Sequence, residues 1–198
     1  MNQEVTPDRT VTSSQAPRAR LAGVVYLLYF LTAIAAQTLT SRNFVAAGNA
    51  VNVVAYALYI LLALLFYYMF KPVSNGLSLL AALVSLAGSF EGILDVFHRA
   101  PTKLSPLWFF SFYCLLIGYL VVRSNFLPKF LGWLMLLAGL GWLAFLYPPI
   151  EQRFSVYIEV LGILAEAMLM LWLIIKGVNF ELWRRRARQR CQDSRKYR

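Results

Sequence analysis

Six apolar stretches, each close to the length that crosses a lipid bilayer, constrain this chain more than any other feature. A helix of about 20 apolar residues spans the roughly 30 Å hydrocarbon core of a membrane. Short loops between such helices make successive ones antiparallel neighbours. The pattern therefore predicts an all-α fold, a helical bundle with six transmembrane helices. These cover about 21–39, 49–70, 76–97, 105–122, 128–147 and 154–178.

The composition supports a membrane protein over a soluble one. Hydrophobic residues make up 60% of the 198 residues, and the mean hydropathy is +0.60, whereas a soluble domain needs a polar exterior. The net charge of +10 would suit nucleic acid only if the basic residues formed a patch on a soluble fold. Here they lie at the ends of apolar segments and in the C-terminal tail, so we expect the lipid bilayer as partner and no nucleic acid.

Three regions differ in polarity. Residues 1–20 are polar and aperiodic and predict a disordered cytoplasmic leader, 21–178 form the six-helix transmembrane domain, and 179–198 form a basic cytoplasmic tail. An alternative for the start is a secretory signal peptide, because Arg18 and Arg20 precede an apolar run that contains "AIAA" at 33–36. The six-helix interpretation is favoured, since that run is long for a signal peptide.

The distribution of Lys and Arg predicts the orientation, because cytoplasmic loops carry an excess of both. We expect the protein in the cytoplasmic membrane with both termini on the cytoplasmic side. The opposite face has only four basic residues, which are Arg42, Arg99, Lys103 and Arg153. The tail from Arg184 to Arg198 could also lie along the inner leaflet, where each basic residue contributes about 1 kcal/mol with anionic lipid. The simpler interpretation, a topology anchor, is favoured.

Four of the nine acidic residues lie within apolar segments. Glu91 and Asp95 lie on the third predicted helix, with the chain's single histidine, His98, at i+7 from Glu91 on the same face. Glu159 and Glu166 share a face of the sixth. An ionised carboxylate facing lipid at a helix centre costs about 2.5 to 3.5 kcal/mol. These side chains should therefore face the interior of the bundle.

The candidate site for a ligand or a proton is centred on the deepest pair, Glu91 and Glu166, which we expect to be protonated, partnered by amides or exposed to a water-filled cavity. Shallower candidates in the same outer half complete the predicted set: Asp95, His98, Glu159 and Asn52. The alternative is that these groups hydrogen-bond across helices and only specify packing. A metal site is left open, because Glu91, Asp95 and His98 span about 10 Å of one helix and would need ligands from elsewhere.

Other chemistry has little support in the sequence. The two cysteines, Cys114 and Cys191, lie in different environments and predict no disulfide. One histidine cannot supply both axial ligands of a membrane haem, and no Walker loop, GxGxxG, GxSxG or HExxH motif occurs. We therefore expect no cofactor and assign no catalytic residue. Trp142 and the other aromatic residues near helix ends are interpreted as headgroup anchors.

Several segments resemble a bacterial family of membrane proteins catalogued as domain of unknown function 4386. They are "RLAGVVYLLYFLTAIA" from Arg20, "FEGILDVF" around Glu91, "RSNFLPKFLGWLMLLAGLGWL" at 123–143 and "GILAEAMLMLWLIIKGVN" at 162–179. The family pattern is matched by Arg123, Ser124, Pro128 and Lys129, and then by Glu166, Trp172, Lys176, Gly177 and Asn179. The chain departs from many members in a short third connection and in Asp95 and His98 beside Glu91. The resemblance implies the membrane fold and no activity.

Three functions fit these features. The preferred one is binding or passage of a small polar solute, cation or proton through an outward-facing polar cavity. The second is a non-catalytic membrane partner or assembly factor with structural carboxylates. The third, an intramembrane enzyme, requires Glu91, Asp95 and His98 to converge. Substrate, oligomeric state and physiological role do not follow from the sequence.

Overall fold

The computed structural model describes residues 15–97 and 105–196, which form seven α-helices and no strand. His98 lies outside the described residues. The helices are α1 (Gln15–Ser41), α2 (Val45–Phe70), α3 (Asn75–Val96), α4 (Pro106–Arg123), α5 (Lys129–Phe145), α6 (Pro148–Ile175) and α7 (Phe180–Lys196). The six predicted apolar segments are all helical, and α7 is an additional helix in the basic tail.

Helix ends follow local sequence signals. Ser74 and Ser105 cap α3 and α4 by accepting hydrogen bonds from the amides of Leu77 and Leu107. The α2 helix ends at Phe70, immediately before Lys71 and Pro72, as predicted. The largest differences are at α1, which begins six residues before the predicted start at Leu21, and at α6, which begins at Pro148. Proline is favourable in a first helical turn, where its missing N–H is not needed.

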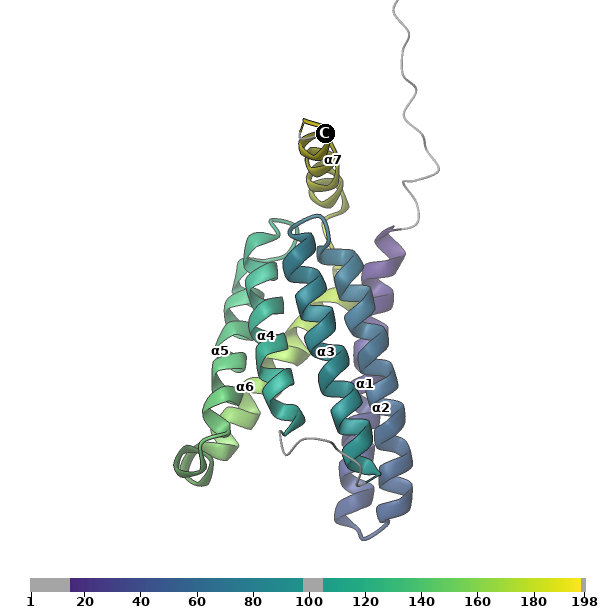
Figure 1. Ribbon diagram of the computed structural model, residues 1–198, viewed down its shortest axis with the longest axis vertical. Coiled ribbons are helices and arrows are strands. Elements are labelled where there is room, and N and C mark those ends of the chain that lie inside the picture. Colours follow the sequence, from purple (N-terminus) through teal and green to yellow (C-terminus); the bar gives the residue numbers. More distant parts are fainter. Residues whose placement is uncertain (1–14, 98–104, 197–198) are drawn as a thin grey trace, which may run out of the picture.

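The six apolar helices form a ring. Each packs against its neighbours in sequence, from α1·α2 to α5·α6, and α1 also packs against α6, which closes the ring. Figure 1 shows these helices running alternately up and down, with α7 at one end and the α1–α2 loop at the other. A closed ring of six helices has an interior that must be filled by side chains or left hollow.

Polarity is distributed as expected for a protein embedded in lipid. Large apolar side chains point outward along the helices, including Leu31, Leu61, Leu83, Leu137 and Leu171. Serines and carboxylates are buried inside, among them Ser78, Ser85, Ser89, Glu91 and Glu166. Within the described residues, five helices are long and apolar enough to cross a membrane, namely α1, α2, α3, α4 and α6, whereas α5 is apolar but only 17 residues long. The chain is therefore a helical membrane protein.

Glycines allow a close helix contact between α4 and α5. A Cβ atom added at Gly132 would lie 2.7 Å from the carbonyl oxygen of Gly118, and one at Gly118 would lie 2.9 Å from the carbonyl oxygen of Gly132. Small residues let helix backbones approach in this way inside membranes. The α4 and α5 backbones are therefore in near contact at these two positions.

The half of the ring nearest α7 is filled by large apolar side chains. Phe66 and Phe70 from α2 pack edge to face, with their ring centroids 5.9 Å apart, and Phe70 stacks on Phe126 at 5.9 Å. Leu120, Leu131, Met135, Leu169 and Leu173 complete a core whose members are almost fully buried. This half of the bundle is a conventional packed interior.

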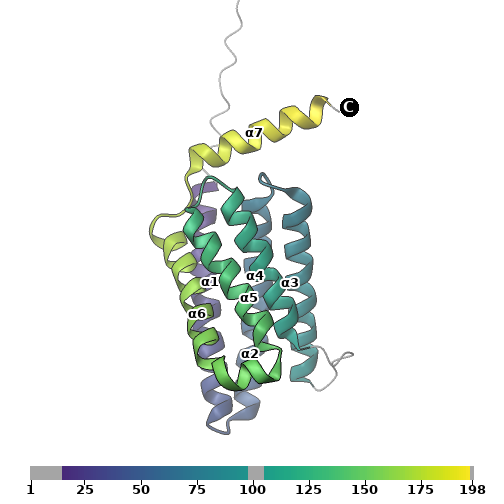
Figure 2. The same cartoon turned by 90° about the vertical axis from the view of Figure 1, so that its left-hand side faces the viewer.

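Helix α7 crosses the end of the packed half (Figure 2). The indole N–H of Trp183 donates to the carbonyl of Met69 at 2.9 Å, and Arg186 donates to the carbonyl of Arg123 at 2.9 Å. Arg190 likewise donates to the carbonyl of Lys71. These acceptors lie at the C-terminal ends of α2 and α4, where carbonyls lack helical partners and the helix dipole favours positive charge.

Candidate functional site

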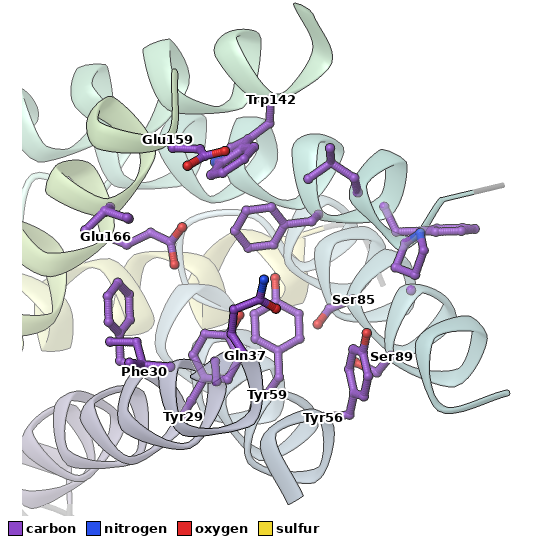
Figure 3. A pocket seen from close by; sticks show the side chains of 18 residues that line it. Tyr29, Phe30, Gln37, Tyr56, Tyr59, Ser85, Ser89, Trp142, Glu159 and Glu166 are labelled. Carbon is purple, nitrogen blue, oxygen red and sulfur yellow. The ribbon is translucent and has the colours of Figure 1, made fainter. Parts of the chain in front are cut away.

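A cavity of about 520 Å³ occupies the half of the ring away from α7. All six helices of the ring contribute to its lining. The lining residues lie from the middle of each helix to the end farthest from α7, so the cavity runs along the axis of the bundle. Figure 3 shows the side chains of its 18 lining residues converging from opposite sides.

The deep end of the cavity carries a buried carboxylate. Glu166 on α6 is 5% exposed, and its Oε2 accepts a hydrogen bond of 3.0 Å from the phenol of Tyr26 on α1. This bond joins the two helices whose contact closes the ring. Tyr26 occupies one acceptor position, and a carboxylate offers about four. Glu166 can therefore hold the packing and still accept a further donor from the cavity.

The shallow end is more polar and more exposed. Glu159 lies two helical turns before Glu166 on α6 and is exposed, as is Gln37 on α1. In Figure 3 both carboxylates and the amide of Gln37 point into the space between α6 and α1. The cavity thus runs from an exposed acidic mouth to a buried acidic floor.

Four aromatic rings form a continuous wall. The centroids of Tyr29 and Tyr59 are 5.0 Å apart, those of Tyr59 and Phe110 are 6.1 Å apart, and those of Phe110 and Trp142 are 5.7 Å apart. All four residues line the cavity, one each from α1, α2, α4 and α5. Such offset or edge-to-face pairs stabilise an aromatic cluster and present ring surfaces to a ligand.

Several buried polar atoms of the cavity-lining residues have no hydrogen-bond partner. They are Tyr59 Oη, Ser85 Oγ, Ser89 Oγ and Trp142 Nε1, and each belongs to a residue that lines the cavity. Ser85 and Ser89 are 1% exposed and Tyr59 is 7% exposed. A buried polar group without a partner costs about 1 to 3 kcal/mol, so these atoms are candidates for contact with a bound ligand.

The structure separates the two carboxylates that the sequence places together. Glu166 and Glu159 line the cavity, whereas Glu91 does not, although it is buried at 6% exposure on α3. Asp95 is exposed near the end of α3, and Asn52 is half-buried on α2; neither lines the cavity. Of the predicted site residues that the structure describes, two line the cavity and three lie elsewhere.

Sequence reasoning misses most of the cavity lining. Trp142 is interpreted from the sequence as a headgroup anchor, but its ring packs on Gly162 of α6 and lines the cavity. Ser85 and Ser89 fall on the same face of α3 as Ser78, and this stripe of serines in an apolar helix is the signal that could have found them. Tyr29 and Tyr59 carry no comparable signal in isolated helices.

Metal ligation has little support in the described part of the chain. No group of three or more His, Cys, Asp or Glu side chains there could hold a metal ion. Glu159 and Glu166 are about 10 Å apart along their helix, two turns at 1.5 Å per residue, so they do not converge on one small ion. The enzyme interpretation stays a prediction, because Glu91 is buried, Asp95 is exposed and His98 lies outside the described residues.

Comparison with known proteins gives two matches. Residues 91–177 match the family model described as "Domain of unknown function (DUF4386)". A protein of Archaeoglobus fulgidus, named only as uncharacterized, is 32% identical over 124 residues, which cover 58% of this chain and 74% of the relative. No solved structure matches significantly.

Several residues that carry the sequence resemblance meet at the end nearest α7. The backbone N–H of Asn179 donates to the carbonyl of Phe126 at 3.2 Å, which joins the α4–α5 connection to the α6–α7 connection. Trp172 packs edge to face on Phe130, and Lys176 lies over the Trp172 ring. These residues of the family pattern serve packing at the α7 end, whereas Glu166, which also belongs to the pattern, lines the cavity.

Proposed function

Because this chain belongs to the family of the domain of unknown function DUF4386, whose description names no activity, we propose a function from the cavity itself. The protein binds, or passes across the cytoplasmic membrane, a small polar solute, cation or proton. Glu166 is the main binding residue and Glu159 recruits the ligand at the mouth. The observation that carries this proposal is a cavity of about 520 Å³ with a buried carboxylate on its floor.

The proposal includes an orientation. All six helices of the ring cross the membrane, both termini are cytoplasmic, and the cavity opens on the outer side. Support comes from the basic residues at the α7 end, which include Lys71, Arg123, Lys129 and Lys176 besides those of α7 itself. The opposite end has Arg42 and Arg153 among the described residues.

A ligand-stability measurement tests the proposal. The unfolding midpoint of the purified protein is measured with sodium, potassium, benzyltrimethylammonium or glycerol, and across a pH series, for wild type, Glu166→Gln and Glu151→Gln. A ligand that binds only the folded state raises the midpoint. We expect at least one condition to raise it in wild type and in Glu151→Gln, an exposed charge-matched control on the same helix, and not in Glu166→Gln.

The same measurement addresses the second function, a membrane partner with structural carboxylates. The Tyr26–Glu166 hydrogen bond favours that function, since it links α1 to α6 without any ligand. If none of the conditions raises the wild-type midpoint and Glu166→Gln simply lowers it, binding is wrong and the structural function stands. Glu91→Gln is measured in parallel, because its predicted role in binding stays a prediction.

We also propose that α7 lies on the inner leaflet and binds anionic lipid. Arg185 and Arg188 are exposed on α7, and each basic residue near such a surface contributes about 1 kcal/mol. Replacing both by Gln should reduce the extra stability that anionic lipid gives over zwitterionic lipid in nanodiscs. If the extra stability in anionic lipid is the same in the double variant and in wild type, α7 acts only as a topology anchor.

A further inference from the structure

We propose that the ligand of the cavity is an organic cation with an apolar body, such as a substituted ammonium ion. This inference rests on the proposed function and specifies its ligand class. Four independent features of the cavity support it: its charge, its aromatic wall, its unpartnered hydrogen-bonding atoms and its size.

The charge of the lining selects against anions. Its ionisable side chains are two carboxylates, Glu159 and Glu166, and three tyrosines, and no Lys or Arg occurs among the described lining residues. A cleft lined by one sign of charge raises the local concentration of the opposite sign. The acidic mouth would therefore attract cations, and the buried Glu166 would pair with them.

The aromatic wall suits a cation that has lost its hydration shell. The faces of Trp, Tyr and Phe attract ammonium groups within about 6 Å of the ring centroid. Cation–π pairs within the described protein use other rings, those of Tyr67, Tyr119, Trp172 and Phe180, which lie toward the α7 end. The wall of Tyr29, Tyr59, Phe110 and Trp142 is therefore available to an external cation.

The hydrogen-bonding atoms are placed to orient a polar substituent. Ser85 and Ser89 lie on α3, across the cavity from the carboxylates on α6 (Figure 3). Their hydroxyls and that of Tyr59 are unpartnered and more than nine-tenths buried. A ligand that carries a cationic group and, at its other end, a hydroxyl, amine or carbonyl could pair with Glu166 and also hydrogen-bond to these hydroxyls.

Size excludes a bare inorganic ion as the natural fit. A volume of about 520 Å³ falls within the roughly 300 to 1,000 Å³ typical of sites for drug-sized molecules. A small metal ion needs several oxygen ligands at about 2 to 2.6 Å, which two carboxylates separated by two helical turns cannot supply. An organic cation fills the space and uses both the rings and the carboxylates.

Binding of four probes to the purified full chain tests the inference. They are benzyltrimethylammonium, its neutral carbon analogue neopentylbenzene, the anion benzenesulfonate, and sodium. We expect benzyltrimethylammonium to bind at least about tenfold more tightly than the neutral analogue and the anion, a ratio within reach of a buried ion pair and cation–π contacts. Glu166→Gln should weaken its binding about tenfold, and Glu151→Gln should leave the affinity unchanged.

Two variants test the aromatic wall. Phe110→Leu keeps an apolar side chain and removes the π face, and Trp142→Phe keeps a ring with a weaker attraction for cations. Both should weaken binding of benzyltrimethylammonium more than binding of neopentylbenzene. If Phe110→Leu fails to fold, Trp142→Phe still distinguishes the two ligands.

The possible failures are distinguishable. Stabilisation by sodium or by protons that depends on Glu166, without binding of the organic cation, overturns this inference and leaves the proposed function standing. Equal binding of the cation and its neutral analogue, unaffected by Glu166→Gln, overturns this inference, and the proposed function falls with it if sodium, potassium, glycerol and pH also leave the wild-type midpoint unchanged.

Discussion

The two halves of the helical ring share the same six helices but differ in what fills them. Near α7, Phe66, Leu120 and Leu169 are almost fully buried in a packed core. Away from α7, the same helices surround a cavity of about 520 Å³, with Glu166 at the boundary between the halves. The difference lies in the side chains opposite α3, because α3 presents small residues throughout, from Ser78 and Ala81 to Ser89.

This contrast indicates that the two halves serve different purposes. Packed protein interiors leave few voids larger than a water molecule, so a cavity flanked by unpartnered polar atoms costs stability. Proteins break packing rules mainly at functional sites. The packed half holds the ring together and seats α7, and this allows the other half to remain open.

The largest expected effect is disruption of the α4–α5 contact in the ring. In Gly132→Leu the new Cβ would lie 2.7 Å from the carbonyl oxygen of Gly118 and from the backbone nitrogen of Val122, so the helices must separate. We expect a loss of about 3 kcal/mol or more, measured by reversible unfolding in mixed micelles. Gly76→Leu is the control, because a Cβ there meets nothing within 4 Å. If both variants lost the same free energy of unfolding, α4 and α5 would not be in close contact at Gly132.

The next prediction compares the two halves of the ring directly. Phe66→Ala should cost about 3 kcal/mol, because it opens a void in a packed region. Phe30→Ala, at the cavity wall, should cost less than Phe66→Ala, because one side of that ring already faces open space. Unfolding free energies of the two variants check this. A cost at Phe30 as large as that at Phe66 would mean that the cavity is not open in solution.

A smaller effect is expected at the boundary between the halves. Tyr26→Phe removes the donor to Glu166 and should cost about 1 to 2 kcal/mol, because a buried acceptor loses its partner. Tyr68→Phe is the matched control, since Tyr68 is 55% exposed. If Tyr26→Phe were as harmless as Tyr68→Phe, the hydrogen bond would not contribute to closing the ring.

The smallest effect concerns the seating of α7. Arg186→Gln removes a charged donor from the carbonyl of Arg123 and should cost about 1 kcal/mol. Arg185→Gln changes the charge equally at an exposed position of the same helix. Protease sensitivity of the C-terminal helix should rise in the first variant only. Equal sensitivity would show that α7 is held by other contacts.

The sequence predicts the helices well because each apolar run is long and the breaks at Lys71–Pro72 and at Pro128 are strong. It does not predict α7, whose polar composition hides the spacing of Phe180, Trp183 and Ala187 on one face. The cap by Asn179, which accepts from the amide of Leu182 at 3.3 Å, is the local signal for that helix.

The site is predicted only in part, because contacts between distant helices decide it. Glu166 stands out as a carboxylate in an apolar helix, and the requirement that it face inward is correct. Its partner Tyr26 is 140 residues away, and no spacing rule connects them. Pairing Glu166 with Glu91 rests on similar depth and on the family resemblance, and neither says which side of the ring interior a residue faces.

Accessibility of the cavity to water tests the central claim most directly. Ser89 and Ser78 are both 1% exposed on α3, but Ser89 lines the cavity and Ser78 lies in the packed half. Each is replaced by Cys in a background without Cys114 and Cys191 and treated on intact cells with a membrane-impermeant trimethylammonium methanethiosulfonate. Labelling of Ser89→Cys from outside, with Ser78→Cys unreactive, is the predicted result. If neither cysteine is labelled, or if Ser89→Cys is labelled only from the cytoplasmic side, the result would contradict an outward-facing cavity that admits cations.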